Sequence, residues 1–366
     1  MRYAIVSISI ASLLAGAACA ASDETPTSDL VRRVDSIFAG AVDEGRSASY
    51  AVGIEQDGNV VLAKGYGLAD VENDVPATAE TVYRIGSITK QFTAAAIMQL
   101  VEAGTIALDD PLRKYVPGLP LQGHTVTIHH LLTHTSGIPS YTSLGERFWS
   151  RSRIDLSHAE LIDLIDDDPF DFAPGDQWRY NNSGYYLLGM IIENASGQAY
   201  DEYIDDHLVV PLGLTGTSYC HERNIILHRA EGYAKEADTL INDEPLSMNV
   251  PGAAGALCST VNDLLAWRRA LFAGDIVSSE SLTKMTTPVT LNDDSTTAYA
   301  YGLAVGNLEG HREIAHGGGI NGFNTFMAYY PDDQLTIVVL SNTEGGGPGP
   351  LSREVAGIML ATSHTP

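Results

Sequence analysis

The sequence predicts an α+β fold, also describable as an α/β sandwich: one antiparallel sheet flanked by terminal helices, with an inserted, mostly helical subdomain. Strand patterns separated by turns occur near both ends of the chain, whereas the middle holds helical patterns with few strand signals. An amphipathic helix is expected at each end of the mature chain. The sheet-forming part is expected at about 28–86 and 252–366, and the helical insert at about 87–251.

The first 20 residues are expected to be a signal peptide. Arg2 supplies a positive charge, and residues 4–17 form an apolar stretch too short to span a membrane comfortably. The small residues Ala18-Cys19-Ala20 predict cleavage after Ala20, so a periplasmic or secreted mature protein covering 21–366 is expected. Lipidation of Cys19 is the alternative, disfavoured because Gly16 stands where a lipoprotein signal usually carries leucine. No later segment is long and apolar enough to span a bilayer.

The first half of the sheet is expected directly after a helix over residues 27–44, whose apolar side chains recur at helical spacing and which ends at Gly45. The stretches SYAVGIEQDG and NVVLAKGYGLAD predict a hairpin around Asp57-Gly58-Asn59. A short strand-like run, TVYRI, leads to Gly86, and a helix is expected from Ser87 to Gly104.

The remaining elements follow from similar signals. In the middle, helices are expected over DLSHAELIDLIDD, over SGYYLLGMIIENASG, which Gly197 stops, and over DEYIDDHLVVPLGL, which Pro211 ends. After the helix VNDLLAWRRALFAG, strands are expected in YAYGLAVGNLEG and in the stretch from Arg312 to Gly345, with a hairpin turn at Pro331-Asp332-Asp333. GGGPGP is expected to be a flexible loop, and PLSREVAGIMLAT a closing helix.

Composition narrows the function. The chain carries 21 basic and 46 acidic side chains, a formal charge of −25, and the acidic residues are scattered. Such a surface repels nucleic acids and anionic membranes, so a small-molecule or peptide substrate is the expected partner. Two cysteines, Cys220 and Cys258, remain after signal removal; in an exported chain they could form a disulfide, or they could be two buried thiols. The sequence does not indicate an oligomeric state.

Ser87-x-x-Lys90 is the first candidate for chemistry. Residues three apart share a helix face, so the lysine amine can approach the serine hydroxyl. A hydroxyl is a poor nucleophile unless a base takes its proton, and a lysine in an apolar pocket has a lowered pKa that suits this task. Free N–H groups at the helix start would favour an oxyanion. The simpler interpretation is a capping serine beside a solvated lysine.

Two further motifs lie later in the chain. Tyr180 and Asn182 precede a helix; they could be a core tyrosine and an N-cap, or a proton shuttle with a pKa lowered by nearby cations and a side chain that binds Lys90 and a substrate amide. His316 is followed by three glycines on an expected edge strand, which would let a substrate backbone lie close, although a bulge or flexible loop explains the glycines equally well.

In this order, Ser-x-x-Lys, Tyr-x-Asn and His-x-Gly together resemble the serine β-lactamase and penicillin-binding protein superfamily. The similarity is closest to the class C β-lactamase-related branch, which includes D-aminopeptidases, DD-carboxypeptidases and β-lactamase-fold esterases. It extends over about Val31 to Met359 and includes the stretches VYRIGSITKQFTAAAIMQLVEAG, LLTHTSGIPSY, PGDQWRYNNSGYYLLGMIIE, PLGLTGTSY and HGGGINGFNT. The resemblance implies a β-lactamase/transpeptidase-like fold.

The resemblance also implies roles for the matching residues. Ser87 would be the acylated nucleophile, Lys90 and Tyr180 the acid/base pair, and Asn182 the group that aligns Lys90 and the substrate. No metal or organic cofactor is implied. An exported serine hydrolase that forms an acyl-enzyme is therefore expected.

On the late strand, the resemblance implies that His316, Gly318 and Gly319 bind substrate, with the N–H groups of Ser87 and Gly319 forming the oxyanion hole. His316 stands where β-lactamases usually carry lysine. Because a histidine is mostly neutral at pH 7, it would be a weaker anchor for a β-lactam carboxylate, though still a hydrogen-bond donor. In the helical insert, Tyr-Asn-Asn stands in place of the Ser-Asp-Asn of other branches.

These departures favour the cleavage of esters, D-amino-acid amides or peptides. A class C-like β-lactamase is the alternative. A non-catalytic penicillin-binding or sensor module is a further one, weakened because every expected catalytic side chain is present. A metal site at His129, His130 and His134 is disfavoured because no glutamate stands beside His130; these histidines are expected to order a loop by hydrogen bonding. The Gly-x-Ser-x-Gly frame of α/β-hydrolases is absent.

Overall fold

We describe a computed structural model of the chain, covering residues 26–166 and 168–362. The expected signal peptide, its cleavage site after Ala20 and the alternative lipidation of Cys19 lie outside the described residues. Within them, none of the helices combines the length and apolarity needed to cross a bilayer.

A seven-stranded antiparallel sheet contains strands from both ends of the chain, in the order β3-β2-β1-β12-β11-β10-β9. The first half contributes β1 (Ser49–Gln56), β2 (Asn59–Asp70) and β3 (Val75–Pro76), and the second half contributes β9 (Ala304–Leu308), β10 (His311–Ile320), β11 (Phe323–Tyr330) and β12 (Leu335–Ser341). The two halves join where β1 pairs with β12, with Val52 opposite Val339. The predicted fold class is thus confirmed.

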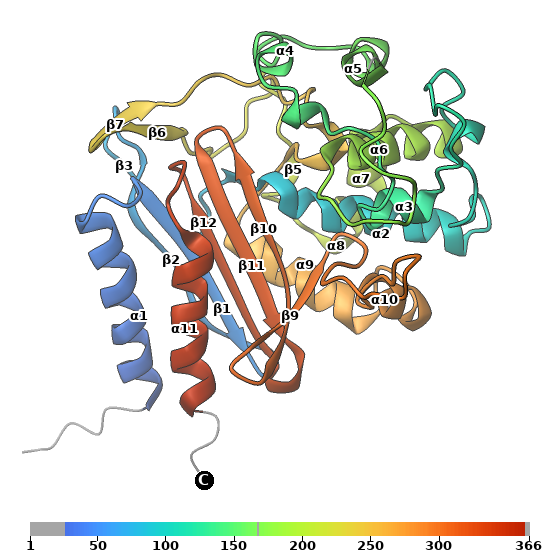
Figure 1. The fold of residues 1–366 in the computed structure, drawn as a ribbon. Helices are drawn as coiled ribbons and strands as arrows, with labels where there is room; N and C mark the ends of the chain where they lie inside the picture. The colour runs from blue at the N-terminus through green and yellow to red at the C-terminus, as the bar shows by residue number, and fades with distance from the viewer. Residues whose placement is uncertain (1–25, 167, 363–366) are drawn as a thin grey trace, which may run out of the picture.

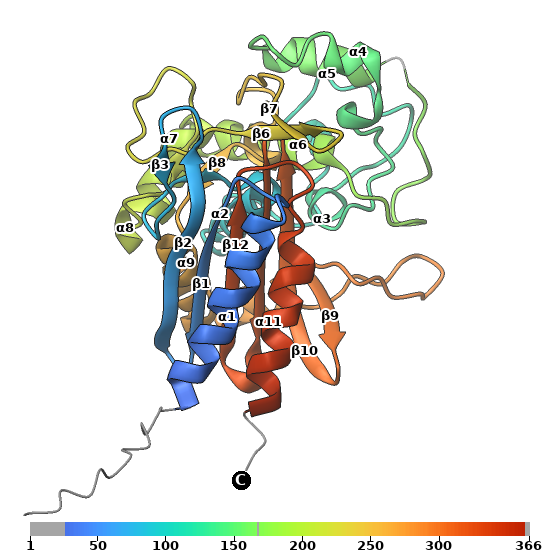
Figure 2. The same cartoon turned by 90° about the vertical axis from the view of Figure 1, so that its left-hand side faces the viewer.

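Two terminal helices, α1 (Pro26–Asp43) and α11 (Pro348–Thr362), lie side by side on one face of the sheet (Figures 1 and 2). Strand β12 is buried on both faces: Ile337 and Val339 pack toward these helices, and Val338 and Leu340 toward the other face. This explains its nearly continuous apolar sequence. Helix α11 begins at Pro348, so the predicted GGGPGP loop is helical in its second half; proline is tolerated in a first helical turn.

The opposite face of the sheet is covered by α9 (Val261–Ala273), and α2 (Thr89–Glu102) lies deeper, between the sheet and the helical part of the molecule (Figure 1). Helix α2 is buried almost all round. The helical part surrounds it with η2 (Leu112–Lys114), α3 (Ile128–Leu132), η3 (Tyr141–Ser143), α4 (Glu146–Trp149), α5 (His158–Asp166), α6 (Asn182–Ser196), α7 (Tyr200–Ile204), η4 (Asp205–Val209), α8 (Val210–Leu212), η5 (Gly252–Ala254) and α10 (Ser279–Met285).

The short strand β4 (Tyr83–Arg84) lies within the predicted strand-like run TVYRI, whereas the short strands later in the middle of the chain were not predicted. A small sheet has the order β4 (Tyr83–Arg84), β8 (Leu257–Ser259) and β5 (Ser218–Tyr219), and β6 (Tyr233–Glu236) pairs with β7 (Thr239–Asn242). Pro211 does not end the third predicted helix, because α8 continues to Leu212 and Gly213 closes it in a left-handed conformation. The predicted turn at 331–333 is present as η6 (Pro331–Asp333) between β11 and β12.

Candidate active site

Ser87 lies in η1 (Gly86–Ile88), a 3-10 turn that connects β4 to α2. Neither η1 nor α2 has a side-chain cap, so the interpretation of Ser87 as a capping residue is wrong. Gly86 has a φ of +51°, and a Cβ there would stand 3.0 Å from the Gly319 nitrogen. A glycine at this position therefore lets β10 approach the turn that carries Ser87.

Lys90 is completely buried one turn after Ser87. Its Nζ lies 3.1 Å from Ser87 Oγ, 2.9 Å from Asn182 Oδ1 and 2.7 Å from the Ala254 carbonyl oxygen. Burial lowers the pKa of Lys90 well below its ordinary value. In all three contacts Lys90 Nζ is the donor, and loss of one proton would leave a lone pair that can face the Ser87 hydroxyl. This arrangement suits a base that takes the serine proton.

Tyr180 lies just before α6, with its ring centroid 4.8 Å from Lys90 Nζ. Burial raises the pKa of Tyr180, and the nearby Ser87 hydroxyl only partly counteracts the rise. The expectation of a lowered pKa is therefore wrong for the free protein, because burial disfavours the charged phenolate. The phenol oxygen is buried and makes no hydrogen bond of good geometry with any described residue. The phenol therefore keeps its proton, and the Ser87 hydroxyl is the neighbouring group that acts on it.

The two consecutive asparagines Asn181 and Asn182 have different roles: Asn181 caps a helix, and Asn182 contacts Lys90 in the site. Asn181 is the N-cap of α6, since its Oδ1 accepts from the Gly184 N–H at 2.7 Å. Asn182 is the first residue of that helix and not its cap, which corrects the simpler interpretation of the motif. Asn182 Oδ1 accepts from Lys90, and Nδ2 donates to Thr142 Oγ1 at 3.0 Å. The amide orientation is thereby fixed toward Lys90.

A cavity of about 260 Å³ opens over Ser87, and Asn182 and Gly319 also border it. Gly319 is exposed on β10, so its backbone is accessible beside the serine. Gly318 is buried instead, and a Cβ on it would stand 2.1 Å from the Ile85 carbonyl oxygen. Gly318 therefore has a packing role, because only a glycine lets β10 lie against the segment before Ser87, and its expected role in substrate binding stays a prediction.

The Beta-lactamase family model matches residues 34–357. The chain belongs to this family. Protein flp of Staphylococcus aureus is 31% identical over 326 residues, with 86% of this chain and 64% of that protein covered. This chain spans about two thirds of the length of the curated relatives it matches.

Two solved structures share the β-lactamase fold of this chain. The octameric penicillin-binding protein homologue from Pyrococcus abyssi has 34% identity and a TM-score of 0.79, with 90% of this chain and 77% of that chain covered. The D-stereospecific amidohydrolase from Streptomyces sp. has 28% identity and a TM-score of 0.77, with 88% and 97% covered. The resemblance inferred from sequence motifs is thus confirmed at the level of a family of serine hydrolases.

His316 does not offer a hydrogen bond to a ligand in this β-lactamase-family site. Nδ1 lies 2.6 Å from the Gly317 carbonyl oxygen and must donate to it, so Nε2 accepts from the Tyr299 hydroxyl at 2.8 Å. The side chain is only 6% exposed, and burial together with Lys90 lowers the pKa of His316 to about 3. The expectation that His316 donates to a substrate is wrong for this arrangement; the histidine is neutral and internally bonded.

The three histidines considered for a metal have separate partners. His129 Nδ1 lies 2.8 Å from the Tyr301 hydroxyl, the Thr127 N–H donates to His130 Nδ1, and the Asn181 N–H donates to His134 Nδ1 at 3.1 Å. Across residues 26–166 and 168–362, His, Cys, Asp and Glu side chains nowhere gather in threes suited to a metal ion. His134 also packs on Tyr180, with ring centroids 4.4 Å apart, so it supports the loop before α6.

Some contributors carry no recognisable sequence signal. Ala254 acts through its backbone carbonyl, which any residue would supply. Tyr299 bonds His316 from a loop without regular structure, and Thr142 reaches Asn182 from η3. A Ser-x-x-Lys or Tyr-x-Asn spacing can be seen in one dimension, whereas these contacts exist only after folding.

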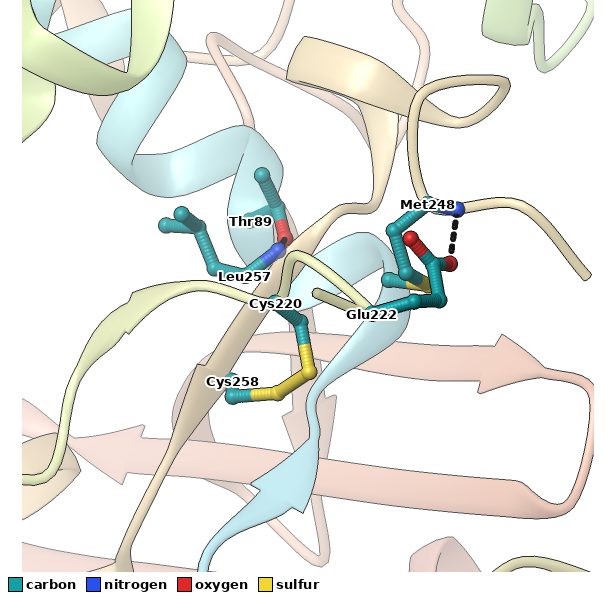
Figure 3. The surroundings of a disulfide bond; sticks show 6 residues. All are labelled: Thr89, Cys220, Glu222, Met248, Leu257 and Cys258. Atoms are coloured by element: carbon teal, nitrogen blue, oxygen red, sulfur yellow. Dashed lines mark hydrogen bonds between the residues drawn. A yellow bond between two sulfur atoms is a disulfide. The ribbon is translucent and has the colours of Figure 1, made fainter. Parts of the chain in front are cut away.

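Cys220 and Cys258 form a disulfide, with Cα atoms 5.3 Å apart (Figure 3). Cys220 follows β5 and Cys258 lies on β8, which also pairs with β4 just before the Ser87 turn. The neighbouring Leu257 N–H donates to Thr89 Oγ1 at the start of α2 (Figure 3). The disulfide therefore links β8 to the residue that follows β5, in the small sheet next to the Ser87 turn. A crosslink that closes a loop of this size typically stabilises a fold by about 2–4 kcal/mol.

Proposed function

We propose that this chain is an exported serine hydrolase that forms an acyl-enzyme on Ser87 and cleaves esters or D-amino-acid amides or peptides. The contact between buried Lys90 Nζ and Ser87 Oγ, 3.1 Å long, carries this proposal. A lysine with a lowered pKa, beside a hydroxyl that borders an open cavity, is the arrangement that nucleophilic catalysis requires.

The reaction follows from the positions of these groups. Lys90 takes the Ser87 proton as Oγ attacks the substrate carbonyl carbon, and the carbonyl oxygen becomes an oxyanion. The backbone N–H groups of Ser87 and Gly319 stabilise that oxyanion. Tyr180 donates its proton to the leaving alkoxide or amine and regains one from Lys90. Water then attacks the acyl-enzyme, and Lys90 with Tyr180 again moves the proton until Ser87 and a carboxylic acid are released.

The residues that border the cavity favour neutral or aminoacyl substrates over β-lactams. No lysine, arginine or histidine is among the described residues that border it, so a β-lactam carboxylate has no cation to bind there. The Streptomyces relative is named a D-stereospecific amidohydrolase, which agrees with this substrate class. The division into a sheet-forming part at about 28–86 and 252–366 and an insert at about 87–251 belongs to the same proposal, as does export through cleavage after Ala20.

Covalent labelling tests the proposal. Incubation with a fluorophosphonate should add one adduct to the intact mass of the wild-type protein, and a digest should place it on Ser87. The Ser87→Ala variant should remain unlabelled under the same conditions. Absence of label on the wild type would contradict the proposal and would favour a non-catalytic binding module.

A substrate panel separates the enzymatic alternatives. We expect p-nitrophenyl acetate and butyrate, or D-alanine p-nitroanilide, to be turned over with a higher kcat/KM than nitrocefin. Dominant hydrolysis of nitrocefin would instead identify a class C-like β-lactamase, and dominant release of D-alanine from a D-Ala-D-Ala peptide a carboxypeptidase.

A further inference from the structure

Glu344 borders the same cavity as Ser87 and is the only formally charged side chain among the described residues that do so. It lies in the loop between β12 and α11, far from the Ser-x-x-Lys motif in the sequence. Its carboxylate makes no hydrogen bond or ion pair with any described residue, and the residue is exposed. The sequence motifs gave no reason to consider it.

The backbone around Glu344 is held in place, although its carboxylate has no partner among the described residues. The Glu344 N–H donates to the Tyr233 carbonyl oxygen at 2.8 Å, and the next N–H, of Gly345, donates to Asn324 Oδ1 at 2.5 Å. Asn324 in turn lies directly opposite Gly319, across the β10–β11 pair. A continuous set of contacts therefore connects the position of Glu344 to the strand that lies beside Ser87.

The rest of the cavity shows what kind of group could reach Glu344. Apolar and aromatic side chains border it, among them Tyr141, Phe148 and Trp149, and Trp149 is 49% exposed. A ligand with an apolar side chain and one positive charge would find a partner for each part, whereas a ligand carboxylate would find no cationic side chain among the described residues that border the cavity.

We infer that Glu344 is the acceptor for a substrate ammonium group, and that the preferred acyl donor is an aminoacyl amide or ester with a free α-amino group. This rests on the proposed acylation of Ser87 and specifies its substrate class. The ammonium hydrogen-bonds to the Glu344 carboxylate, and the amino-acid side chain packs on the aromatic border of the cavity. The alternative is that Glu344 is simply one more solvated carboxylate on an acidic protein.

The experiment compares D-alanine p-nitroanilide with its N-acetyl derivative, which lacks the ammonium. The measured quantity is the ratio of the two kcat/KM values, because any change in the shared acylation chemistry cancels in it. We expect the wild type to favour the free amine by about tenfold or more, as one charge-assisted hydrogen bond provides. Glu344→Gln should reduce this preference about tenfold, and Glu344→Lys should reduce it further by repulsion.

A matched control is Glu354→Gln, which neutralises an exposed glutamate on α11 that does not border the cavity. Its ratio should equal that of the wild type, which excludes a general effect of net charge on a protein of charge −25. A pH series adds an independent readout. The wild-type ratio should fall as pH rises through about 8, where an α-amino group loses its proton.

Each outcome decides one question. An unchanged ratio in both Glu344 variants, a wild-type preference for the N-acetyl substrate, or turnover of p-nitrophenyl butyrate without turnover of either anilide would overturn the role of Glu344 and leave the acyl-enzyme intact. Failure of Ser87 to react with the butyrate ester or the fluorophosphonate would instead overturn the proposed function itself.

Discussion

The two walls of the cleft present polar groups to a substrate in different ways. The wall formed by η1, α2 and the start of α6 uses side chains: Ser87, Lys90 and Asn182 are joined by hydrogen bonds, and Ser87 and Asn182 border the cavity. The wall formed by β10 presents backbone groups to the cavity. There Gly319 is exposed beside the serine, while the side chain of His316 is buried and bonded within the protein.

This difference separates reactivity from placement. On the helical wall, removal of one functional group removes a step of the chemistry while the fold persists. On the strand wall, the proposed chemistry uses none of the described side chains. The distance between β10 and η1 therefore matters most, and glycines set that distance. Substitutions on the two walls should therefore differ in whether activity alone or activity and stability fall together.

The largest effect is expected for Lys90→Met, which keeps the length and apolar stem of the side chain but removes the amine. The kcat for p-nitrophenyl butyrate should fall by roughly 10³-fold or more, because loss of a general base typically costs 10²–10⁴-fold. Lys284→Met, at an exposed ion pair on α10, is the matched control and should retain wild-type turnover. Circular dichroism checks the fold of both variants; turnover of Lys90→Met at the wild-type rate would refute the base.

A somewhat smaller loss is expected for Tyr180→Phe, about 10²–10³-fold in kcat. The change should leave Tm within about 1 °C, because the deleted hydroxyl makes no hydrogen bond of good geometry with any described residue and so contributes little to stability. Activity and thermal unfolding of the same preparation test this. A large drop in Tm would show that the phenol oxygen is a structural group, and unchanged kcat would remove Tyr180 as the proton shuttle.

A moderate effect is expected on the strand wall from Gly318→Ala. The added Cβ would stand 2.1 Å from the Ile85 carbonyl oxygen, so β10 must move away from the turn that carries Ser87. Overpacking of this kind costs about 1–3 kcal/mol, and we expect kcat/KM to fall about tenfold together with Tm. Gly317→Ala is the control, because its Cβ meets its nearest neighbours at 3.6 Å or more. Equal behaviour of the two variants would contradict the packing role of Gly318.

The helical wall is also the part that sequence reasoning described better. A spacing of three on a helix predicts contact directly, and Lys90 does lie beside Ser87. The fold class follows from periodicity in the same way. The hydrogen bonding of His316 could not be predicted from spacing or periodicity. It depends on Tyr299, 17 residues away in a loop, and on a ring nitrogen bonded to the backbone. Desolvation also reversed the expected pKa shift of Tyr180, since burial is a property of the folded chain.

The smallest effect concerns pH and tests whether His316 is neutral. Burial lowers the folded-state pKa of His316 to about 3, against about 6.5 in an unfolded chain. Between these values the unfolded state binds a proton that the native state does not. Stability is therefore lost as pH falls below 6.5, by about 1.4 kcal/mol per pH unit for this group.

The His316→Gln variant removes that proton while keeping a side chain that can bond Tyr299. In urea unfolding, the wild type should lose about 1.6 kcal/mol more than the variant between pH 6.5 and pH 5. Equal losses would mean that His316 is protonated in the native state. It would then present a positive charge on the strand wall, and a substrate carboxylate could bind there after all. A larger loss in the wild type keeps the strand wall uncharged, which leaves the charge of Glu344 as the one that selects among substrates.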